Sequence, residues 1–189
     1  MTDLFISVDV ETDGPIPGAN SMLSIGAAAF TGDRRMHGTF SANLELLDGA
    51  VPDEDTMKWW SIQGAAWDAH RKNLRHPAHA MVDFIAWVAD MTVASGGKPV
   101  FVGYPAGFDF TFVYWYLISF VGQSPFAFTA LDIKTYAMAV LGADYTSITK
   151  RTLGRFMEPD LKHTHVALDD AIEQGYLFLN LRAAREQAL

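Results

Sequence analysis

The stretch LFISVDVE, residues 4–11, decides the fold. Apolar and polar residues alternate along it with the period of two that is typical of a β-strand. Leu4, Ile6, Val8 and Val10 share one face, and the opposite face carries Ser7, Asp9 and Glu11. We therefore predict a strand that buries its apolar face and holds two carboxylates side by side on the other.

The paired carboxylates predict a metal site. Two acids this close repel each other, and each raises the pKa of the other unless a cation lies between them. Mg²⁺ and Mn²⁺ are hard cations that prefer oxygen ligands, so either would satisfy Asp9 and Glu11. The alternative interpretation is an exposed edge strand with its polar residues facing water, for which two acids are an unusual choice.

Outward from this strand, the pattern changes from strands to alternating helices and strands. GPIPG at residues 14–18 predicts a turn, and strands are expected at 22–30 and around 40–44, which suggests an antiparallel meander. The remaining expected elements are helices within 53–94 with a break at Pro77, a strand at 98–102, a helix at 109–121, a strand at 128–131, helices at 132–141 and 148–157, and a last helix from residue 165 or 166. This order predicts one α/β domain over residues 1–189, with a mixed five-stranded sheet flanked by helices and its first three strands antiparallel.

Length and composition exclude several classes of protein. The chain has 189 residues, enough for one domain with a substantial core. It has no cysteine, which excludes disulfides and thiolate metal sites. The N-terminus does not resemble a signal peptide, and the longest apolar stretches are shorter than the ~20 residues of a membrane span. We expect a cytoplasmic protein that does not bind a membrane.

The net charge of −8 at first disfavours a nucleic-acid partner. Bound cations would neutralise part of that charge, and the basic residues are clustered. One group is Arg71, Lys72, Arg75 and His76, and the other is Lys150, Arg151, Arg155, Lys162 and His163. The second group is expected to bind the phosphate backbone, and the alternative is a solvated helix face.

Two further acids each follow an expected strand. Asp109 comes after a buried strand and a loop that contains Pro105 and Gly107, and taken alone it is best interpreted as the N-cap of the aromatic helix behind it. Asp132 follows the last expected strand in the same way, and we interpret it as a cap.

The segment HVALDD, residues 165–170, carries a histidine and an acid five positions apart. This offset suits a histidine on the loop before a helix and an acid inside its first turns. Asp169 shares a polar stripe with Glu173, Tyr176 and Asn180 that is expected to face solvent. Asp170 lies on a largely apolar, inward stripe, where a carboxylate needs a partner and a metal would provide one. His163 lacks this offset and is interpreted as a surface or phosphate-neighbouring residue.

DVETDG at residues 9–14, FD at 108–109 and H-x4-D at 165–170 together resemble the DEDDh exonuclease superfamily, which includes ribonuclease T, oligoribonuclease and the proofreading subunits of bacterial replicases. The resemblance covers nearly the whole chain. It implies a ribonuclease H-like fold and 3′→5′ removal of nucleotides from single-stranded DNA or RNA ends with two divalent cations, Mg²⁺ or Mn²⁺. The metal ligands that it implies are Asp9, Glu11, Asp109 and Asp170.

The resemblance also implies roles near the substrate and a possible homodimer. His165 matches the general base, and an ordinary imidazole pKa near ~6.5 suits it to take a proton from water at neutral pH. Thr12 matches the position beside the 3′-terminal nucleotide, and Phe108 is expected to border the terminal base. Trp59 and Trp60 could stack on an unpaired base, although core packing is the stronger interpretation for at least one of them.

Departures from the family pattern leave other functions open. Asp13 replaces a threonine near the expected phosphates, and Tyr104 and Pro105 replace a histidine and an asparagine. These departures bear on the substrate. One alternative is a catalytically weak module on the same fold that binds nucleic acid or a partner. Another is an endonuclease of the ribonuclease H kind, against which the H-x4-D element argues.

Overall fold

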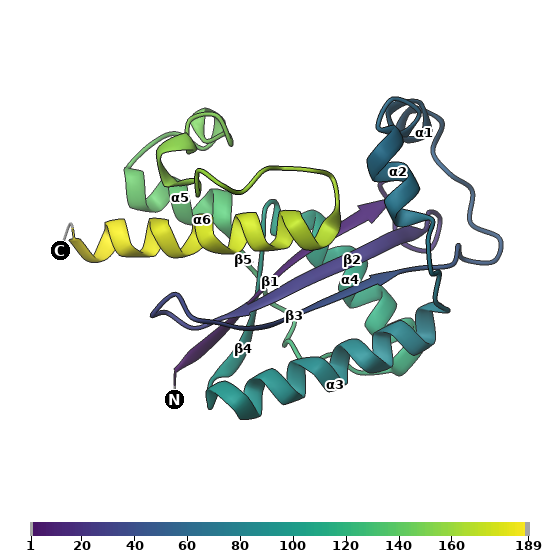
Figure 1. The fold of residues 1–189 in the computed structure, drawn as a ribbon, viewed down its shortest axis with the longest axis horizontal. Helices are drawn as coiled ribbons and strands as arrows, with labels where there is room; N and C mark the ends of the chain where they lie inside the picture. Colours follow the sequence, from purple (N-terminus) through teal and green to yellow (C-terminus); the bar gives the residue numbers. More distant parts are fainter. Residues whose placement is uncertain (1, 188–189) are drawn as a thin grey trace.

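A computed structural model describes residues 2–187, and its centre is a five-stranded mixed sheet (Figure 1). The strand order is β3-β2-β1-β4-β5. The strands are β1 Asp3–Thr12, β2 Met22–Phe30, β3 Met36–Asn43, β4 Lys98–Gly103 and β5 Leu131–Asp132. β2 is antiparallel to both β1 and β3, whereas β4 runs parallel to β1 and to β5. The predicted mixed sheet with an antiparallel first half is therefore confirmed.

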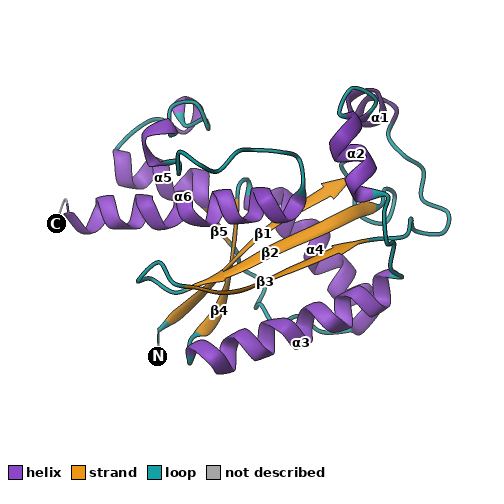
Figure 2. Ribbon diagram, viewed as in Figure 1, coloured by secondary structure: helices purple, strands orange, loops and turns teal. Residues whose placement is uncertain are grey.

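Helices cover both faces of the sheet (Figure 2). They are α1 Glu54–Trp60, α2 Gly64–His70, α3 Pro77–Ser95, α4 Ala106–Val121, α5 Ile133–Leu141 and α6 Ala167–Gln187. α5 and α6 lie on one face, α3 and α4 lie on the other, and α1 and α2 lie near the end of β1. Among these helices, none combines the length and the apolar character that a membrane crossing requires.

The alternation along β1 sends its side chains to two separate cores. Leu4, Ile6, Val8 and Val10 are buried with residues of α3 and α4. On the other face, the Phe5 ring packs edge-on against Phe178 of α6 at 4.9 Å between ring centroids. Because side chains alternate, Ser7, Asp9 and Glu11 share the α6 face with Phe5. The predicted apolar face of this strand is thus confirmed.

Two glycines let α6 lie directly on the sheet. Gly26 is the β2 partner of Asp9, and a Cβ built on Gly26 would lie 2.2 Å from the carbonyl carbon of Ala167, the first residue of α6. A Cβ on Gly175, further along α6, would lie 2.4 Å from the ring of Phe30. The missing side chains therefore set the distance between helix and sheet, and they bring the start of α6 over Asp9.

The prediction of a helix at 148–157 is wrong. This segment contains one short 3-10 turn, η2 Gly154–Phe156, and a second turn, η1 Tyr145–Ser147, lies just before it. The Thr152 hydroxyl donates to the carbonyl of Ser147 at 2.9 Å, and it accepts from the amide of Thr149 at 2.9 Å. Threonine side chains thus take hydrogen bonds that a helix would have made within its backbone.

Other boundaries also differ from expectation. The region 53–94 contains three helices, because a turn at 61–63 separates α1 from α2. The last strand is shorter than expected, and Phe128 is 85% exposed. α4 begins at Ala106 because the carboxylate of Asp132 accepts from the Ala106 amide at 2.9 Å. Asp132 also caps α5 through the Thr135 amide at 2.7 Å, which confirms its interpretation as a cap.

Candidate active site

Three acids from the two ends of the chain meet above β1. Asp9, Glu11 and Asp170 each offer a carboxylate oxygen, and these oxygens lie within 4.8 Å of one another. Asp9 and Glu11 project from one face of β1, and Asp170 descends from the first turn of α6, where it is 1% exposed. Three of the four acids that the family resemblance implied as metal ligands therefore lie together.

Asp109 binds β1 at the edge where β4 no longer pairs with it. β1 and β4 pair only as far as Ser7 and Val102, so the peptide groups around Asp9 lack a strand partner on that side. The Val10 amide donates to Asp109 Oδ1 at 3.3 Å, and the side-chain amide of Gln174 donates to the Val8 carbonyl at 2.7 Å. Asp109 is in the first turn of α4 and is 3% exposed, so the interpretation of Asp109 as an N-cap is wrong.

The electrostatics of these acids fit a bound cation. Burial, followed by repulsion from Asp109 and Glu11, raises the pKa of Asp9 well above its ordinary value. Burial and the charge of Asp170 raise the pKa of Glu11 to about 8, and burial raises the pKa of Asp109 to about 8. Asp109 Oδ2 is buried without a hydrogen-bond partner. A divalent cation would remove both the repulsion and the unsatisfied oxygen, which is the chemistry expected of an oxygen-ligand metal site.

His165 lies on the loop just before α6, as predicted. Its backbone amide donates to Asp170 Oδ2 at 3.0 Å. Its ring meets Trp59 edge-on at 4.8 Å and His163 at 4.4 Å between ring centroids. Burial and the neighbouring His163 lower the pKa of His165, which favours the neutral form that can accept a proton.

Comparison with known proteins decides the family. The family model described as "3'-5' exoribonuclease Rv2179c-like domain" matches residues 4–181. The "3'-5' DNA exonuclease Cap18" of Escherichia coli is 35% identical over 178 residues, which cover 93% of this chain and 90% of the relative. The chain belongs to this exonuclease family. It is a 3′→5′ exonuclease, and its resemblance to the wider superfamily is confirmed.

Solved structures of other exonucleases share the fold. S. pombe Pop2p in a form with Mg²⁺ and Mn²⁺ bound has a TM-score of 0.64 at 14% identity, covering 95% of this chain and 82% of that chain. E. coli exonuclease I in complex with a dA16 oligonucleotide has a TM-score of 0.64 at 16% identity, covering 98% of this chain and 41% of that chain. The ribonuclease H-like fold predicted for this exonuclease is therefore confirmed.

Two members of the basic group expected to bind the phosphate backbone, Lys150 and His163, contact the acids of the exonuclease site, which the sequence did not predict. Lys150 Nζ donates to Glu173 at 2.9 Å, and His163 Nδ1 lies 2.9 Å from Asp170 Oδ2 and 3.5 Å from Glu173. Bonds to Asp170 and Glu173 raise the pKa of His163 to about 9. Glu173 is 4% exposed, so the prediction that it faces solvent is wrong.

Lys150 and Asp170 compete for the same nitrogen of His163. Lys150 Nζ lies 2.8 Å from His163 Nδ1, and Nδ1 cannot accept from Lys150 while it donates to Asp170. We regard the bond to Asp170 as the dominant one because the carboxylates favour the charged imidazolium. The spacing of His163 to Asp170 alone carried no signal for this contact.

The expected substrate-binding residues differ in exposure. Thr12 is 6% exposed, and its carbonyl accepts from the indole of Trp60, which is itself core. Phe108 and Trp59 remain 36% and 38% exposed on the rim of the site. Asp13 does not face the substrate region in the expected way, because it is 1% exposed and its Oδ1 accepts from the Ser21 amide at 2.5 Å.

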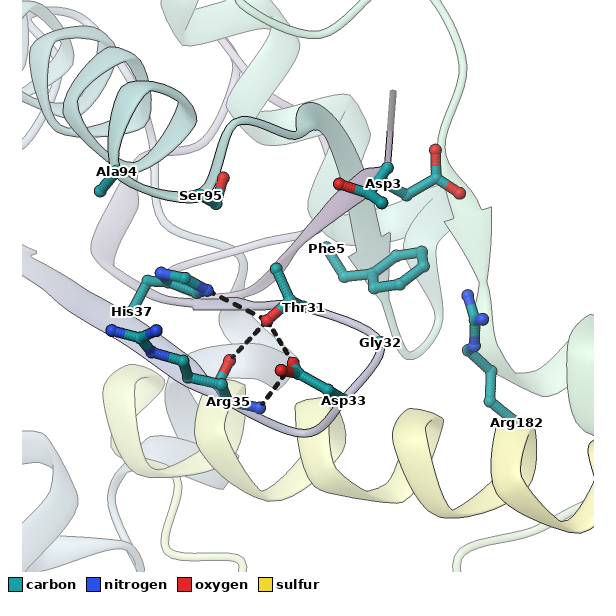
Figure 3. A pocket seen from close by; sticks show the side chains of 11 residues that line it. Asp3, Phe5, Thr31, Gly32, Asp33, Arg35, His37, Ala94, Ser95 and Arg182 are labelled. Atoms are coloured by element: carbon teal, nitrogen blue, oxygen red, sulfur yellow. Dashed lines mark hydrogen bonds between the residues drawn. The ribbon is translucent and has the colours of Figure 1, made fainter.

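A cavity lies away from the carboxylates, at the opposite end of β1 (Figure 3). It has a volume of about 640 Å³, and Asp3, Asp33, Arg35, His37 and Arg182 line it with charges of both signs. The Thr31 hydroxyl donates to Asp33 at 2.6 Å and lies 3.0 Å from His37, which ties these groups into the turn between β2 and β3 (Figure 3). This cavity therefore indicates no particular ligand.

Proposed function

We propose that this exonuclease hydrolyses the terminal phosphodiester bond at the 3′ end of single-stranded DNA or RNA and releases nucleoside 5′-monophosphates. The observation that carries the proposal is the meeting of Asp9, Glu11 and Asp170 within 4.8 Å, beside the unsatisfied Asp109. These four acids would hold two divalent cations, Mg²⁺ or Mn²⁺. When bound, such cations supply a charge clamp for the scissile phosphate and lower the pKa of the attacking water.

We propose His165 as the general base. It lies beside the carboxylates on a loop, it is only partly buried, and its lowered pKa keeps the imidazole neutral near physiological pH. A neutral imidazole can take the proton of the attacking water. The Asp170 bond to its backbone amide holds the loop against the carboxylates.

The rim of the site supports an unpaired strand as the substrate. Trp59 from α1, whose ring contacts His165, and Phe108 from α4, next to Asp109 in the chain, leave aromatic surface exposed. Nucleic-acid bases stack on such rings once they are unpaired, at about 1–3 kcal/mol per base. Lys150 and His163 supply positive charge next to the acids, where a phosphate would arrive. The homodimer expected from the superfamily stays a prediction.

A labelled-end assay tests the proposal. 5′-labelled single-stranded DNA and RNA of one sequence would be incubated with Mg²⁺, with Mn²⁺ and with a chelator, and the released nucleotides would be identified. We expect a shortening ladder that requires the cation and that Asp9→Asn, Asp170→Asn and His165→Ala abolish or strongly reduce. Asp90→Asn, at an exposed acid of α3, is the matched control.

Three results would contradict the proposal. An unchanged ladder in Asp9→Asn and Asp170→Asn would reject the metal ligands, and cleavage of circular substrates would indicate an endonuclease. Binding of the oligonucleotides without cleavage under any divalent cation would favour the catalytically weak binding module.

A further inference from the structure

His165 is held in an unusual backbone conformation. Its φ is +57°, in the left-handed region that residues other than glycine rarely adopt. Such a conformation persists only where the surroundings hold it in place, and it is enriched at functional sites. Asp170 accepts from the His165 amide, and a second group binds the His165 carbonyl.

That group is His70, the last residue of α2. Its Nε2 donates to the carbonyl oxygen of His165 at 2.7 Å, across 95 positions of the sequence. Its Nδ1 lies 2.9 Å from the hydroxyl of Ser24, which pairs with Glu11 in the sheet. A ring that donates through Nε2 and is neutral must accept through Nδ1, so the Ser24 hydroxyl selects the tautomer that can bind His165.

His70 is buried, and both of its ring nitrogens have hydrogen-bond partners. The ring is 1% exposed and meets Trp60 edge-on at 5.1 Å. A cavity of about 200 Å³ adjoins it on another side, lined by Ser24, Ala69, His70 and Val166 among others. The two hydrogen bonds fix the orientation of this buried ring.

We propose that His70 is a positioning residue for the exonuclease, because its bond to the His165 carbonyl keeps the His165 imidazole turned towards the attacking water. The inference rests on the proposed role of His165 as general base. Without the bond, the His165 peptide is free to return to a right-handed conformation, which would swing the ring away from the carboxylates. His70 touches neither the four acids nor the exposed aromatic rim, so substrate binding should be unaffected.

A matched pair of variants isolates the donor. His70→Gln keeps an N–H at a similar reach, whereas His70→Met has a similar length and no donor. We expect His70→Met to lower kcat on the order of 10²-fold with KM unchanged, the typical effect of a misplaced catalytic group. His70→Gln should retain most of kcat. Ser24→Ala should fall between them, and His79→Met, at an exposed histidine, should match the wild type.

Hydrogen exchange gives a second readout that does not depend on cleavage. We expect faster amide exchange across residues 163–168 in His70→Met than in His70→Gln. Circular dichroism would measure the folded fraction of each variant, and kcat would be calculated per folded molecule. Equal kcat and equal exchange in the two variants would overturn the inference. His165→Ala is measured in parallel. If His165→Ala stays fully active, the proposed base is wrong, whereas an inactive His165→Ala beside a fully active His70→Met rejects only the role of His70.

Discussion

Gly26 lies directly opposite Asp9 in the β1–β2 ladder, and its missing side chain is the space into which the first turn of α6 fits. The same turn carries Asp170, so a backbone requirement on one strand determines how closely two carboxylates from opposite ends of the chain approach. The Gly26–Asp9 pair therefore combines the space that α6 needs with a carboxylate of the site.

Gly26→Ala should disrupt both stability and activity. A Cβ at this position would lie 2.2 Å from backbone atoms of Ala167, and the rigid helix must move to admit it. We expect a loss of at least about 1–3 kcal/mol in the free energy of unfolding, measured with urea, and a large loss of cleavage. Gly64→Ala is the control, because a Cβ there meets nothing within 4 Å. Equal stability of the two variants would contradict this account of helix placement.

The stability of the metal-free protein should fall as pH rises. Glu11 has an ordinary pKa of 4.5 that is raised to about 8, and Asp9 and Asp109 shift in the same direction. Between about pH 4.5 and about pH 8 the folded state therefore binds more protons than the unfolded state, and the free energy of unfolding decreases as the pH rises through this range. The pKa of His163 is raised from 6.5 to about 9, so its contribution to stability is lost as the pH rises between these two values.

Divalent cations should reverse this trend, because they bind the deprotonated acids. We expect the rise in melting temperature caused by Mn²⁺ to grow between about pH 5 and about pH 9. Asp109→Asn should flatten the pH dependence measured in a chelator, and Asp90→Asn should leave it unchanged. A Mn²⁺ effect that shrinks with rising pH would exclude these carboxylates as its source.

The Lys150–Glu173 pair should be worth more than a surface ion pair. Glu173 is buried, so Lys150→Met leaves its carboxylate with only His163 nearby, whereas Glu173→Leu leaves a lysine that can reach water. A double-mutant cycle in urea should give a coupling of about 1–3 kcal/mol. The exposed Lys58–Glu54 pair on α1 is the control and should couple by less than about 0.5 kcal/mol. Equal coupling in both cycles would mean that burial of Glu173 has no energetic effect.

Adjacent tryptophans should have separable roles. Trp60 is 2% exposed and donates to the Thr12 carbonyl, so Trp60→Ala should lower the free energy of unfolding by about 3–5 kcal/mol. Trp59 keeps 38% of its surface exposed beside His165, and Trp59→Ala should mainly raise KM for single strands, by the equivalent of about 1–3 kcal/mol. Thermal unfolding and steady-state kinetics on both variants test this division. A Trp59→Ala variant with unchanged KM would remove the proposed stacking surface.

Periodicity correctly predicted the orientation of three of the acids. The alternation along residues 4–11 placed Asp9 and Glu11 on one face of the strand, and the apolar stripe of the last helix placed Asp170 inward. The 148–157 segment failed because threonine side chains take over backbone hydrogen bonds there, an effect that residue spacing does not reveal.

The residue pattern could not predict contacts between side chains that are far apart in the sequence. Glu173 shares a helical stripe with the exposed Asp169, yet it is buried where Lys150 and His163 of the preceding loop contact it. The contact between His70 and His165 joins two segments far apart in the chain. In each case the partner is supplied by the tertiary fold.

Because β1 and β4 stop pairing at Ser7 and Val102, peptide groups of β1 are free to bind side chains from both helical layers. Asp109 of α4 accepts from the Val10 amide, and Gln174 of α6 donates to the Val8 carbonyl. Helices from opposite faces of the sheet thus bind the peptide groups on either side of Asp9. A small displacement of either layer would therefore move Asp9 relative to the other acids. Substitutions deep in either core can be expected to alter turnover before they unfold the enzyme.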